Sequence, residues 1–248
     1  MSVTAGTTDA GQAALGDRVP REPVDDFAPY GIRAFTTTRA AGSFSTHGSE
    51  PVGDVTARWT ALQDDLGPVG PRFATAAQVH GSRVVVHGTA WEGWLRVRGA
   101  DGHVAVERGT GLAVTVADCV PVFIAHPAGA IALLHSGWRG TEARIVEYGI
   151  DALARRGFSA RELLIHLGPA ICGACYEVSA EVFGRLTGRT VEAPATVDLR
   201  ALIAGHARAV GVRQISTSPY CTRCHNDRFF SHRAGDAGRQ LGVMIAEH

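Results

Sequence analysis

Lysine is absent from the 248 residues, and all 24 basic side chains are arginine. This absence excludes enzymes that form a Schiff base on a lysine and nucleotide-binding proteins that need the lysine of a phosphate-binding loop. Recognition of a phosphate or a carboxylate must therefore rely on arginine, whose guanidinium presents a planar fork of donors to such anions.

Long apolar runs and an excess of charge are also missing. No stretch of about 18 apolar residues occurs, so no membrane-spanning helix is expected. The 24 basic and 24 acidic residues give a formal net charge of zero, without the broad positive field that nucleic-acid-binding proteins carry. We therefore expect neither nucleic acid nor a membrane as partner.

The N-terminal segment lacks the basic and apolar regions of a secretory signal. Residues 1–25 are polar and predict a flexible tail, with one domain over residues 26–248. The five cysteines are an odd number, and without an export signal their thiols are expected to stay reduced. These features predict a cytoplasmic protein.

Beyond the tail, short β-type runs alternate with amphipathic segments. Strands are predicted over residues 31–39, 72–79, 83–86, 111–117, 120–126, 130–135, 162–167 and 212–217. Helices are predicted over residues 54–66, 141–156, 177–186, 198–210 and 234–247. The turn at 80–82 is interpreted as joining 72–79 and 83–86 into a strand pair. With no repeat and no linker in the sequence, this mixture predicts a single mixed α/β domain.

Side chains that bind metals occur at the ends of three predicted strands: His80, Cys119 and His135. The run from Cys119 to His135 has the length of a hairpin, which can bring both side chains to one edge of a sheet. Two imidazoles and a thiolate suit zinc or copper and leave a fourth position open, as catalytic sites require. Asp118 is a candidate acceptor for a ligating histidine, or a general base. A buried free cysteine with two hydrogen-bonded core histidines is the alternative.

Five segments carry a resemblance to a known family: QVHG, TVADCVPV, LLHSGWRGT, LGPAICGACYEV and CTRCHNDRFFSHR. In this order they resemble the laccase-domain (YfiH-type) family, whose members have been called multicopper polyphenol oxidases, purine nucleoside phosphorylases and peptidoglycan editing factors. The similarity runs from about Gly31 to the C-terminus. It implies one zinc ion on His80, Cys119 and His135. It also implies mixed β-sheets packed face to face with helices outside, in α/β/β/α layers.

The resemblance further implies phosphorolysis of purine nucleosides (adenosine, inosine, guanosine and methylthioadenosine) and deamination of adenosine. The partners would then be a purine nucleoside and phosphate. A metal with an open position can activate water for deamination, whereas phosphorolysis needs a phosphate directed at the ribose. In the absence of lysine, Arg39 and Arg139 are candidate catalytic residues, and Arg233 is a candidate substrate-binding residue.

The N-terminal third departs from the family pattern. The family's R-x-GG-x-S stretch appears here as the segment from Arg39 to Ser45, RAAGSFS, and the Asn-Leu pair that follows it in the family is missing. Trp91 and Trp94 form an unusual pair that can stack on a base or pack against the core. If the Arg39–Ser45 loop lines the substrate pocket, the substrate can differ from that of the family.

The other four cysteines form two C-x-x-C pairs, Cys172 with Cys175 and Cys221 with Cys224. Two such pairs can hold a second, structural zinc ion on four thiolates. The 45 residues between the pairs exceed the usual spacing, so reduced thiols are expected unless the two loops meet. His225 is either a further ligand or an exposed loop residue.

Three other functions stay open. A copper-dependent polyphenol oxidase (laccase) needs several copper ions held by histidine pairs, yet the chain has no H-x-H motif. A hydrolase that edits peptidoglycan precursors can use Cys119 as nucleophile and His135 as base. A non-enzymatic binding module predicts neither metal nor turnover.

Overall fold

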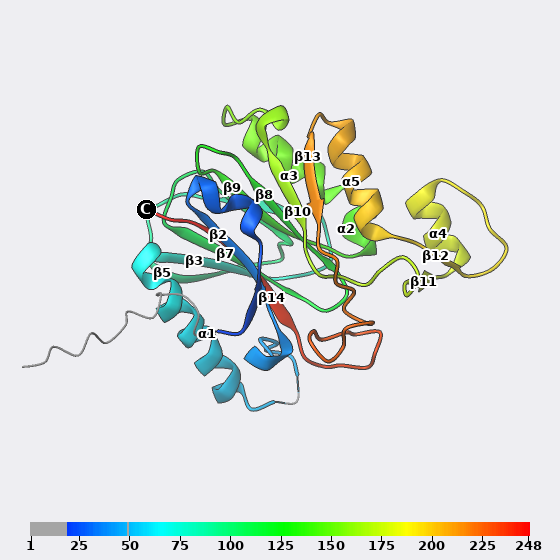
Figure 1. Cartoon of the computed structure of the whole chain (residues 1–248), viewed down its shortest axis with the longest axis horizontal. Coiled ribbons are helices and arrows are strands. Elements are labelled where there is room, and N and C mark those ends of the chain that lie inside the picture. The colour runs from blue at the N-terminus through cyan, green and yellow to red at the C-terminus, as the bar shows by residue number, and fades with distance from the viewer. Residues whose placement is uncertain (1–18, 49) are drawn as a thin grey trace, which may run out of the picture.

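The computed structural model describes residues 19–48 and 50–248. Two mixed β-sheets of six strands each pack face to face, and helices cover their outer faces (Figure 1). The first sheet has the strand order β1-β2-β14-β7-β3-β5, and the second has the order β13-β10-β8-β9-β6-β4. This arrangement confirms the predicted α/β/β/α class.

The elements have the following bounds. The first sheet contains β1 (Arg21–Pro23), β2 (Ile32–Thr37), β3 (Arg72–Ala77), β5 (Gly93–Arg98), β7 (Thr110–Val116) and β14 (Gln240–Ala246). The second contains β4 (Val84–His87), β6 (Gly102–Ala105), β8 (Val120–Ala125), β9 (Ile131–Ser136), β10 (Leu164–Leu167) and β13 (Gln214–Thr217). The helices are α1 (Val52–Leu66), α2 (Trp138–Glu142), α3 (Ile145–Ala154), α4 (Ala180–Thr187) and α5 (Leu199–Ala209). Helix α4 lies with the short strands β11 (Glu177–Val178) and β12 (Ala195–Thr196) in a lobe that projects from the body (Figure 1). Short 3-10 helices cover Asp25–Tyr30, Arg39–Ala41, Gly67–Val69 and Ala160–Glu162.

Three apolar layers hold the fold together. Helix α1 packs Val55, Trp59 and Leu62 onto the outer face of the first sheet. A second layer fills the space between the sheets, where Leu112 meets Phe123. Helices α3 and α5 cover the outer face of the second sheet. The central strands β8, β9 and β14 are buried on both faces and are nearly continuous runs of apolar residues.

The C-terminal segment shows the consequence of this burial. Residues 234–247, predicted as a helix, contain strand β14 instead. Its side chains alternate between two layers: Leu241 and Val243 contact the α1 side, whereas Met244 contacts the layer between the sheets. A strand covered on both faces cannot be told from a buried helix by periodicity alone, which is why the prediction was wrong.

Three other predictions need correction. The strands 72–79 and 83–86 are not a pair, because β3 belongs to the first sheet and β4 to the second, and the chain crosses between the sheets at residues 78–83. The helix predicted over 141–156 is split into α2 and α3, because Arg144 has a left-handed φ of 58°. In the helix predicted over 177–186, the first two residues form β11, and α4 begins at Ala180.

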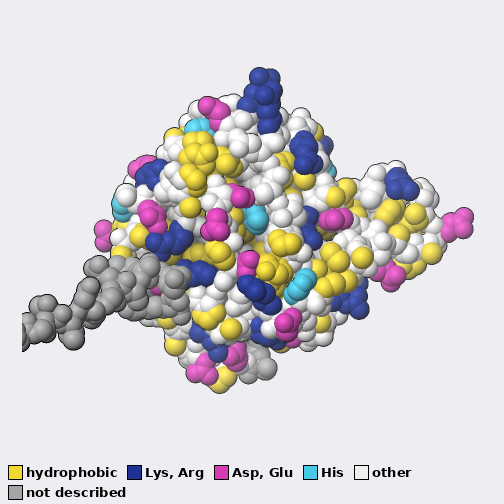
Figure 2. Space-filling model, in the orientation of Figure 1, with side chains coloured by type: hydrophobic (Ala, Val, Ile, Leu, Met, Phe, Trp, Pro, Cys, Tyr) yellow, Lys and Arg dark blue, Asp and Glu magenta, His cyan; other side chains and the backbone are white. Residues whose placement is uncertain are grey.

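The N-terminal boundary also differs from the expectation. Of the predicted tail, residues 1–18 lie outside the described residues, and Arg21–Pro23 form β1, which pairs antiparallel with β2. The fold therefore includes residues before position 26. On the face shown in Figure 2, arginine and acidic side chains are interspersed. Among the helices of the described chain, none has the length and hydropathy needed to cross a membrane.

Candidate metal centre

The three side chains expected to bind a metal converge in the structure. His80 follows β3 of the first sheet, Cys119 lies between β7 and β8, and His135 lies on β9 of the second sheet. One ligand atom from each lies within 4.8 Å of the other two. The rings of His80 and His135 meet edge to face, with their centroids 4.8 Å apart. This spacing is compatible with three ligands to a single ion.

The β8–β9 hairpin brings two of these side chains together, as its length predicts. The strands are antiparallel, and Pro121 lies opposite His135. Cys119 directly precedes β8, so its thiol reaches the end of β9 where His135 lies. Beyond that end, a Cβ atom on Gly137 would lie 2.8 Å from Cys119 Sγ. Only glycine therefore lets the chain pass this close to the sulfur.

A buried aspartate, Asp101, connects His80 and His135. Its Oδ1 lies 2.9 Å from His135 Nδ1 and accepts a hydrogen bond of 2.9 Å from the His80 backbone N–H. Its Oδ2 accepts hydrogen bonds from the N–H groups of Val79 and Gly81. Because a carboxylate only accepts, Nδ1 of His135 carries the proton and Nε2 remains free for a metal.

Asp101 is not among the site residues predicted from the sequence. The available signal was weak: an acidic residue placed directly before an apolar β-type run, in GADGHVAV. Burial opposes ionisation of this carboxyl group, yet the hydrogen bonds from His135, Gly81 and Val79 hold its pKa below the ordinary value. Asp101 is 0% exposed, so its negative charge lies in the interior beside the candidate ligands.

Electrostatics in the metal-free centre favour a thiolate beside a protonated imidazole. Burial opposes the charged form of Cys119, but the neighbouring His135 and hydrogen bonds from both histidines outweigh burial and lower the pKa of the thiol to about 6. Burial likewise opposes protonation of His135, whereas the Cys119 thiolate and the Asp101 carboxylate raise its pKa to about 9. A metal ion would replace the imidazole proton and keep the thiolate paired with a positive charge.

Backbone conformations around the ligands are unusual. His80 and Asp118 have φ angles of 59° and 79°, in the left-handed region that non-glycine residues rarely adopt. Such strain persists only where neighbouring contacts hold it in place, and here the Asp101 carboxylate holds the His80 turn.

Asp118 accepts its hydrogen bonds from neighbouring loops and not from a candidate ligand. Its Oδ1 accepts a 2.6 Å hydrogen bond from the Thr222 hydroxyl, and its Oδ2 accepts a 2.7 Å hydrogen bond from the backbone N–H of Arg233. Its carbonyl accepts a hydrogen bond from the Ile171 N–H. Asp118 therefore ties together three loops beside Cys119, and Asp101 rather than Asp118 is the acceptor for His135.

Two adjoining cavities share His80, Ala117, Cys119 and His232 as a common wall. The first has a volume of about 420 Å³ and the second about 230 Å³. The exposed His232 was not singled out in the sequence, although it lies within the FFSHR segment. The ligand set thus lies at the junction of two spaces that small molecules can enter.

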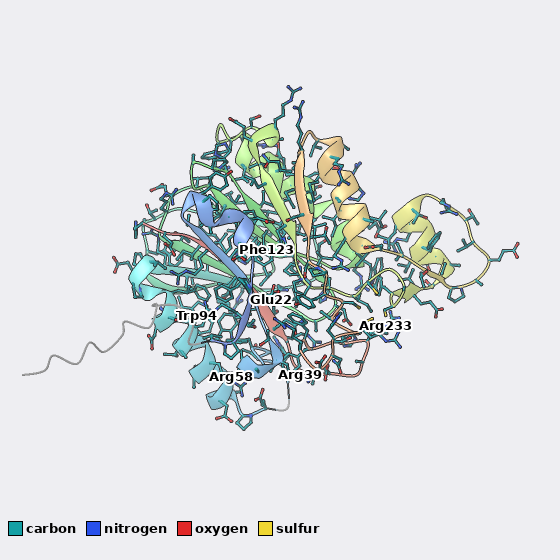
Figure 3. All side chains as sticks on the ribbon, in the orientation of Figure 1. Glu22, Arg39, Arg58, Trp94, Phe123 and Arg233 are labelled. Carbon is teal, nitrogen blue, oxygen red and sulfur yellow. The ribbon has the colours of Figure 1, made fainter. Side chains whose placement is uncertain are left out.

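The larger cavity has an aromatic wall formed by Phe44, Trp59 and Trp94. Trp94 lies on β5 (Figure 3). It stacks on Trp59, with ring centroids 5.0 Å apart and an interplanar angle of 23°, and donates a hydrogen bond to Thr75 Oγ1. Phe44 and Ser45 of the divergent Arg39–Ser45 loop also line this cavity. Trp91, the other tryptophan of the pair, packs against the layer between the sheets instead.

Arg39 does not line either cavity. Its Nε donates to the Asn226 carbonyl at 2.8 Å, and its Nη2 forms a 2.6 Å ion pair with Asp236. The guanidinium also lies 4.4 Å from the centre of the Phe230 ring. Nε and Nη2 of Arg39 therefore hold loops together, and its expected catalytic role stays a prediction.

Arg139 and Arg233 line the smaller cavity. The Arg139 guanidinium stacks on Trp138 and makes no hydrogen bond or ion pair with any residue that the structure describes. Arg233, on the loop before β14 (Figure 3), donates through Nη2 to the Glu177 carbonyl at 3.0 Å. Its guanidinium also stacks on the Tyr176 ring. Both arginines can therefore turn donors toward an anion in this cavity.

Comparison with known proteins identifies relatives of this chain. A family model described as multi-copper polyphenol oxidoreductase laccase matches residues 35–247. A purine nucleoside phosphorylase of Streptomyces coelicolor is 35% identical over 205 residues, which cover 79% of this chain and 84% of the relative. An adenosine deaminase from an unknown prokaryotic organism is 34% identical over 243 residues, which cover 86% and 90%. The crystal structure of the Bacillus licheniformis hypothetical protein YfiH has the same fold, with a TM-score of 0.84, 21% identity and coverage of 93% and 98%.

Proposed function

The chain belongs to the multi-copper polyphenol oxidoreductase laccase family, and we propose that it is a zinc-dependent purine nucleoside phosphorylase that also deaminates adenosine. The observation that carries the proposal is the meeting of His80, Cys119 and His135 at the junction of two cavities. Relatives named for each of the two activities support it. The proposed nucleosides are adenosine, inosine, guanosine and methylthioadenosine, with phosphate as second substrate.

The donor set fits zinc. Two imidazoles and one thiolate are borderline and soft ligands, and three protein ligands leave one position for water or substrate. Cys119 supplies a thiolate, and His135 supplies Nε2 because Asp101 holds Nδ1. When bound, zinc would supply Lewis-acid chemistry at the open position. Copper is the alternative ion for the same donors.

In phosphorolysis, a phosphate oxygen bonds to C1′ of the ribose while the bond from C1′ to the purine nitrogen breaks. The electron pair of the broken bond goes to the base. The protein has to hold both reactants against C1′, which lowers the entropic part of the barrier. We assign the purine to the aromatic wall of the larger cavity. We assign the phosphate to Arg139 and Arg233 in the smaller one.

In deamination, an oxygen from water replaces the amino group at C6 of adenosine, and ammonia leaves. The leaving nitrogen needs a proton and the attacking water has to lose one. His232 lines both cavities and is the candidate side chain for moving this proton. Gln78 also lines the larger cavity. Its amide donates one hydrogen bond to Thr115 and accepts two from it, which fixes the side chain in place.

The test is purification without added metal, elemental analysis, and mass spectrometry of products from adenosine and inosine. With phosphate present, we expect free base and ribose 1-phosphate; without phosphate, we expect inosine from adenosine. A Cys119→Ala variant should lose both reactions and the metal of this centre. A variant that keeps that metal and both reactions would overturn the assignment, as would a wild-type enzyme that oxidises polyphenols through copper.

A second candidate is a hydrolase that edits peptidoglycan precursors through Cys119. The observation that favours it is the chain of Cys119, His135 and Asp101, in which the thiol pKa is lowered to about 6. This arrangement is that of a cysteine nucleophile with an oriented histidine. Hydrolysis of such a precursor by the metal-free enzyme, blocked by alkylation of Cys119, would favour it over the phosphorylase.

A further inference from the structure

The two C-x-x-C pairs meet in space because the strands before them are neighbours. Cys172 and Cys175 lie on the loop after β10, and Cys221 and Cys224 lie on the loop after β13. These strands run parallel, with Leu167 opposite Thr217, so both loops leave the same edge of the second sheet. A bridge between Ala170 and Cys221 continues the pairing into the loops. The two C-x-x-C pairs can therefore form a single site although they are far apart in the sequence.

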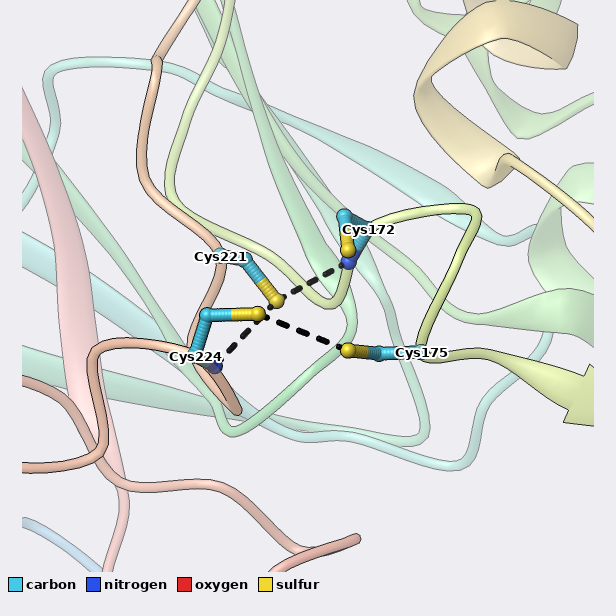
Figure 4. A group of neighbouring side chains, drawn as sticks. All are labelled: Cys172, Cys175, Cys221 and Cys224. Carbon is cyan, nitrogen blue, oxygen red and sulfur yellow. Dashed lines mark hydrogen bonds between the residues drawn. The ribbon is translucent and has the colours of Figure 1, made fainter.

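The four sulfur atoms form one compact group (Figure 4). Their Sγ atoms all lie within 4.8 Å of one another, and Sγ of Cys175 lies 3.5 Å from Sγ of Cys224. In a tetrahedral site with zinc–sulfur bonds of about 2.3 Å, neighbouring sulfurs are about 3.8 Å apart. The distance from Cys175 Sγ to Cys224 Sγ is close to this value, and all four cysteines are free of disulfide bonds.

Backbone N–H groups point at the sulfur of Cys221. The N–H of Cys172 donates to it at 3.3 Å, and the N–H of Cys224 donates to it at 3.5 Å (Figure 4). Such bonds to sulfur favour the thiolate over the thiol and orient it for a metal. One of these donors comes from the other loop, so the two pairs are organised as one unit.

His225 is not part of this group. Its Nδ1 lies 3.1 Å from the carbonyl oxygen of Cys221 and 3.4 Å from the Cys221 backbone nitrogen. The ring therefore contacts the backbone of the second loop. The donors of the group are four thiols and no imidazole, which are soft ligands of the kind that select zinc over magnesium or calcium.

We propose that Cys172, Cys175, Cys221 and Cys224 bind a structural zinc ion through four thiolates. Four protein ligands close the coordination sphere, unlike the three ligands of the centre beside the cavities. The proposal does not depend on the proposed function, because it concerns a different set of side chains.

The proposed site would hold two loops that contact the neighbourhood of Cys119. Thr222, directly after Cys221, donates its hydroxyl to Asp118, and Ile171, directly before Cys172, donates its N–H to the Asp118 carbonyl. Tyr176, directly after Cys175, lines the smaller cavity. The two loops have little regular structure of their own, so a metal would supply the cross-link that a hydrogen-bond ladder supplies elsewhere.

The first test is metal stoichiometry in protein purified under reducing conditions without added metal. We expect about two zinc ions per wild-type chain, about one in Cys119→Ala and about one in Cys224→Ser. Cys224 is exposed, so its replacement by serine leaves the core unchanged. The zinc that Cys224→Ser retains should be the one that Cys119→Ala loses, and the double variant should contain none. If the wild type contains one zinc ion per chain and Cys224→Ser retains that ion, the proposal is overturned.

The second test does not depend on losing a ligand. Cobalt(II) added to metal-free Cys119→Ala should give the strong sulfur-to-cobalt charge-transfer band and the visible bands of a tetrahedral thiolate site. The same spectrum should weaken in Cys119→Ala with Cys224→Ser. Alkylation of denatured, unreduced wild-type protein should modify all five cysteines. Modification of fewer cysteines would mean disulfides between the loops, and that result, like the absence of thiolate bands, would overturn the proposal.

Discussion

Asp101 Oδ1 lies 2.9 Å from His135 Nδ1, and the same carboxylate accepts three backbone N–H groups of the His80 turn. One buried side chain thus orients two candidate ligands that are 55 residues apart in the chain. Because His80 itself is exposed, its position depends on this turn more than on packing. We therefore interpret Asp101 as a positioning residue, which would act on a bound metal through the two histidines.

Replacement of Asp101 by asparagine should weaken metal binding. The amide keeps the size of the side chain but loses the charge that orients His135 Nδ1–H, and changes to such partners typically reduce metal affinity by about 10- to 100-fold. Competition with a chelator measures the affinity. The matched control is Asp65→Asn, which removes another buried carboxylate, one paired with Arg21. Equal affinity in Asp101→Asn and the wild type would contradict the positioning role.

Gly137→Ala should disturb the centre by steric contact alone. The φ of Gly137 is −83°, which alanine adopts readily, but its Cβ would lie 2.8 Å from Cys119 Sγ. Overpacking of this kind costs about 1–3 kcal/mol, which corresponds to a roughly 5- to 150-fold loss of metal affinity if the sulfur has to move. In Gly205→Ala, a helical control where nothing lies within 4 Å, metal affinity should equal that of the wild type. If Gly137→Ala also equals the wild type, the thiol does not bind the metal from this position.

Trp94→Ala should raise KM for nucleosides more than it lowers kcat. The change removes one side of the stacked Trp59–Trp94 wall, and stacking of a base on an aromatic ring contributes about 1–3 kcal/mol. The expected increase in KM is therefore roughly 5- to 150-fold. Trp91→Ala is the control, because that ring packs against the core instead of lining the cavity. A change in kcat alone would argue against a base-binding wall.

Removal of the metal should make Cys119 reactive. With its pKa lowered to about 6, the thiol is ionised at neutral pH, and a bound ion would shield it from alkylation. We expect iodoacetamide to modify Cys119 at least about tenfold faster after chelation, as followed by peptide mass spectrometry. His80→Ala, which lacks one ligand, should be modified quickly without a chelator. Equal rates before and after chelation would show that Cys119 does not bind the metal.

Acid should destabilise the fold through a buried histidine pair. His87 Nε2 lies 2.9 Å from His103 Nδ1, and burial lowers both pKa values, that of His103 to about 3. Below about pH 6.5 these histidines bind protons in the unfolded chain but stay neutral in the folded chain. The free energy of unfolding therefore falls as the pH decreases toward 3. For His103 the slope approaches about 1.4 kcal/mol per pH unit, and His87 adds to it in the same direction.

Urea unfolding of the metal-free protein between about pH 7 and pH 5 measures this slope. His103→Phe should reduce the slope, since the apolar ring has no proton to bind. His47→Gln, which changes an exposed histidine, should leave the slope as in the wild type. If His103→Phe shows the full wild-type slope, the acid sensitivity has another origin.

Much of the candidate centre could be predicted because its chemistry is local. Cys119 and His135 stand at the two ends of a β8–β9 hairpin whose length is readable from two apolar runs and a turn. The partners of those residues could not be predicted in this way. Asp101 directly precedes β6, another strand of the second sheet, and reaches His135 from there, a contact that no short-range pattern records. Arg39 looked suitable for an anion, but its Nε and Nη2 donate to Asn226 and Asp236, which lie nearly 200 positions away.

The sequence by itself determined the ligand types, the resemblance to a family and most of the strands and helices, because each depends on neighbouring residues. Only the tertiary structure decided which strands pair. It separated β3 from β4, placed β14 between β2 and β7, and made β10 and β13 parallel neighbours. Those pairings bury both faces of two sheets at once, which depends on the whole chain. They also bring Cys172 and Cys175 to Cys221 and Cys224, a meeting that the spacing in the sequence argued against.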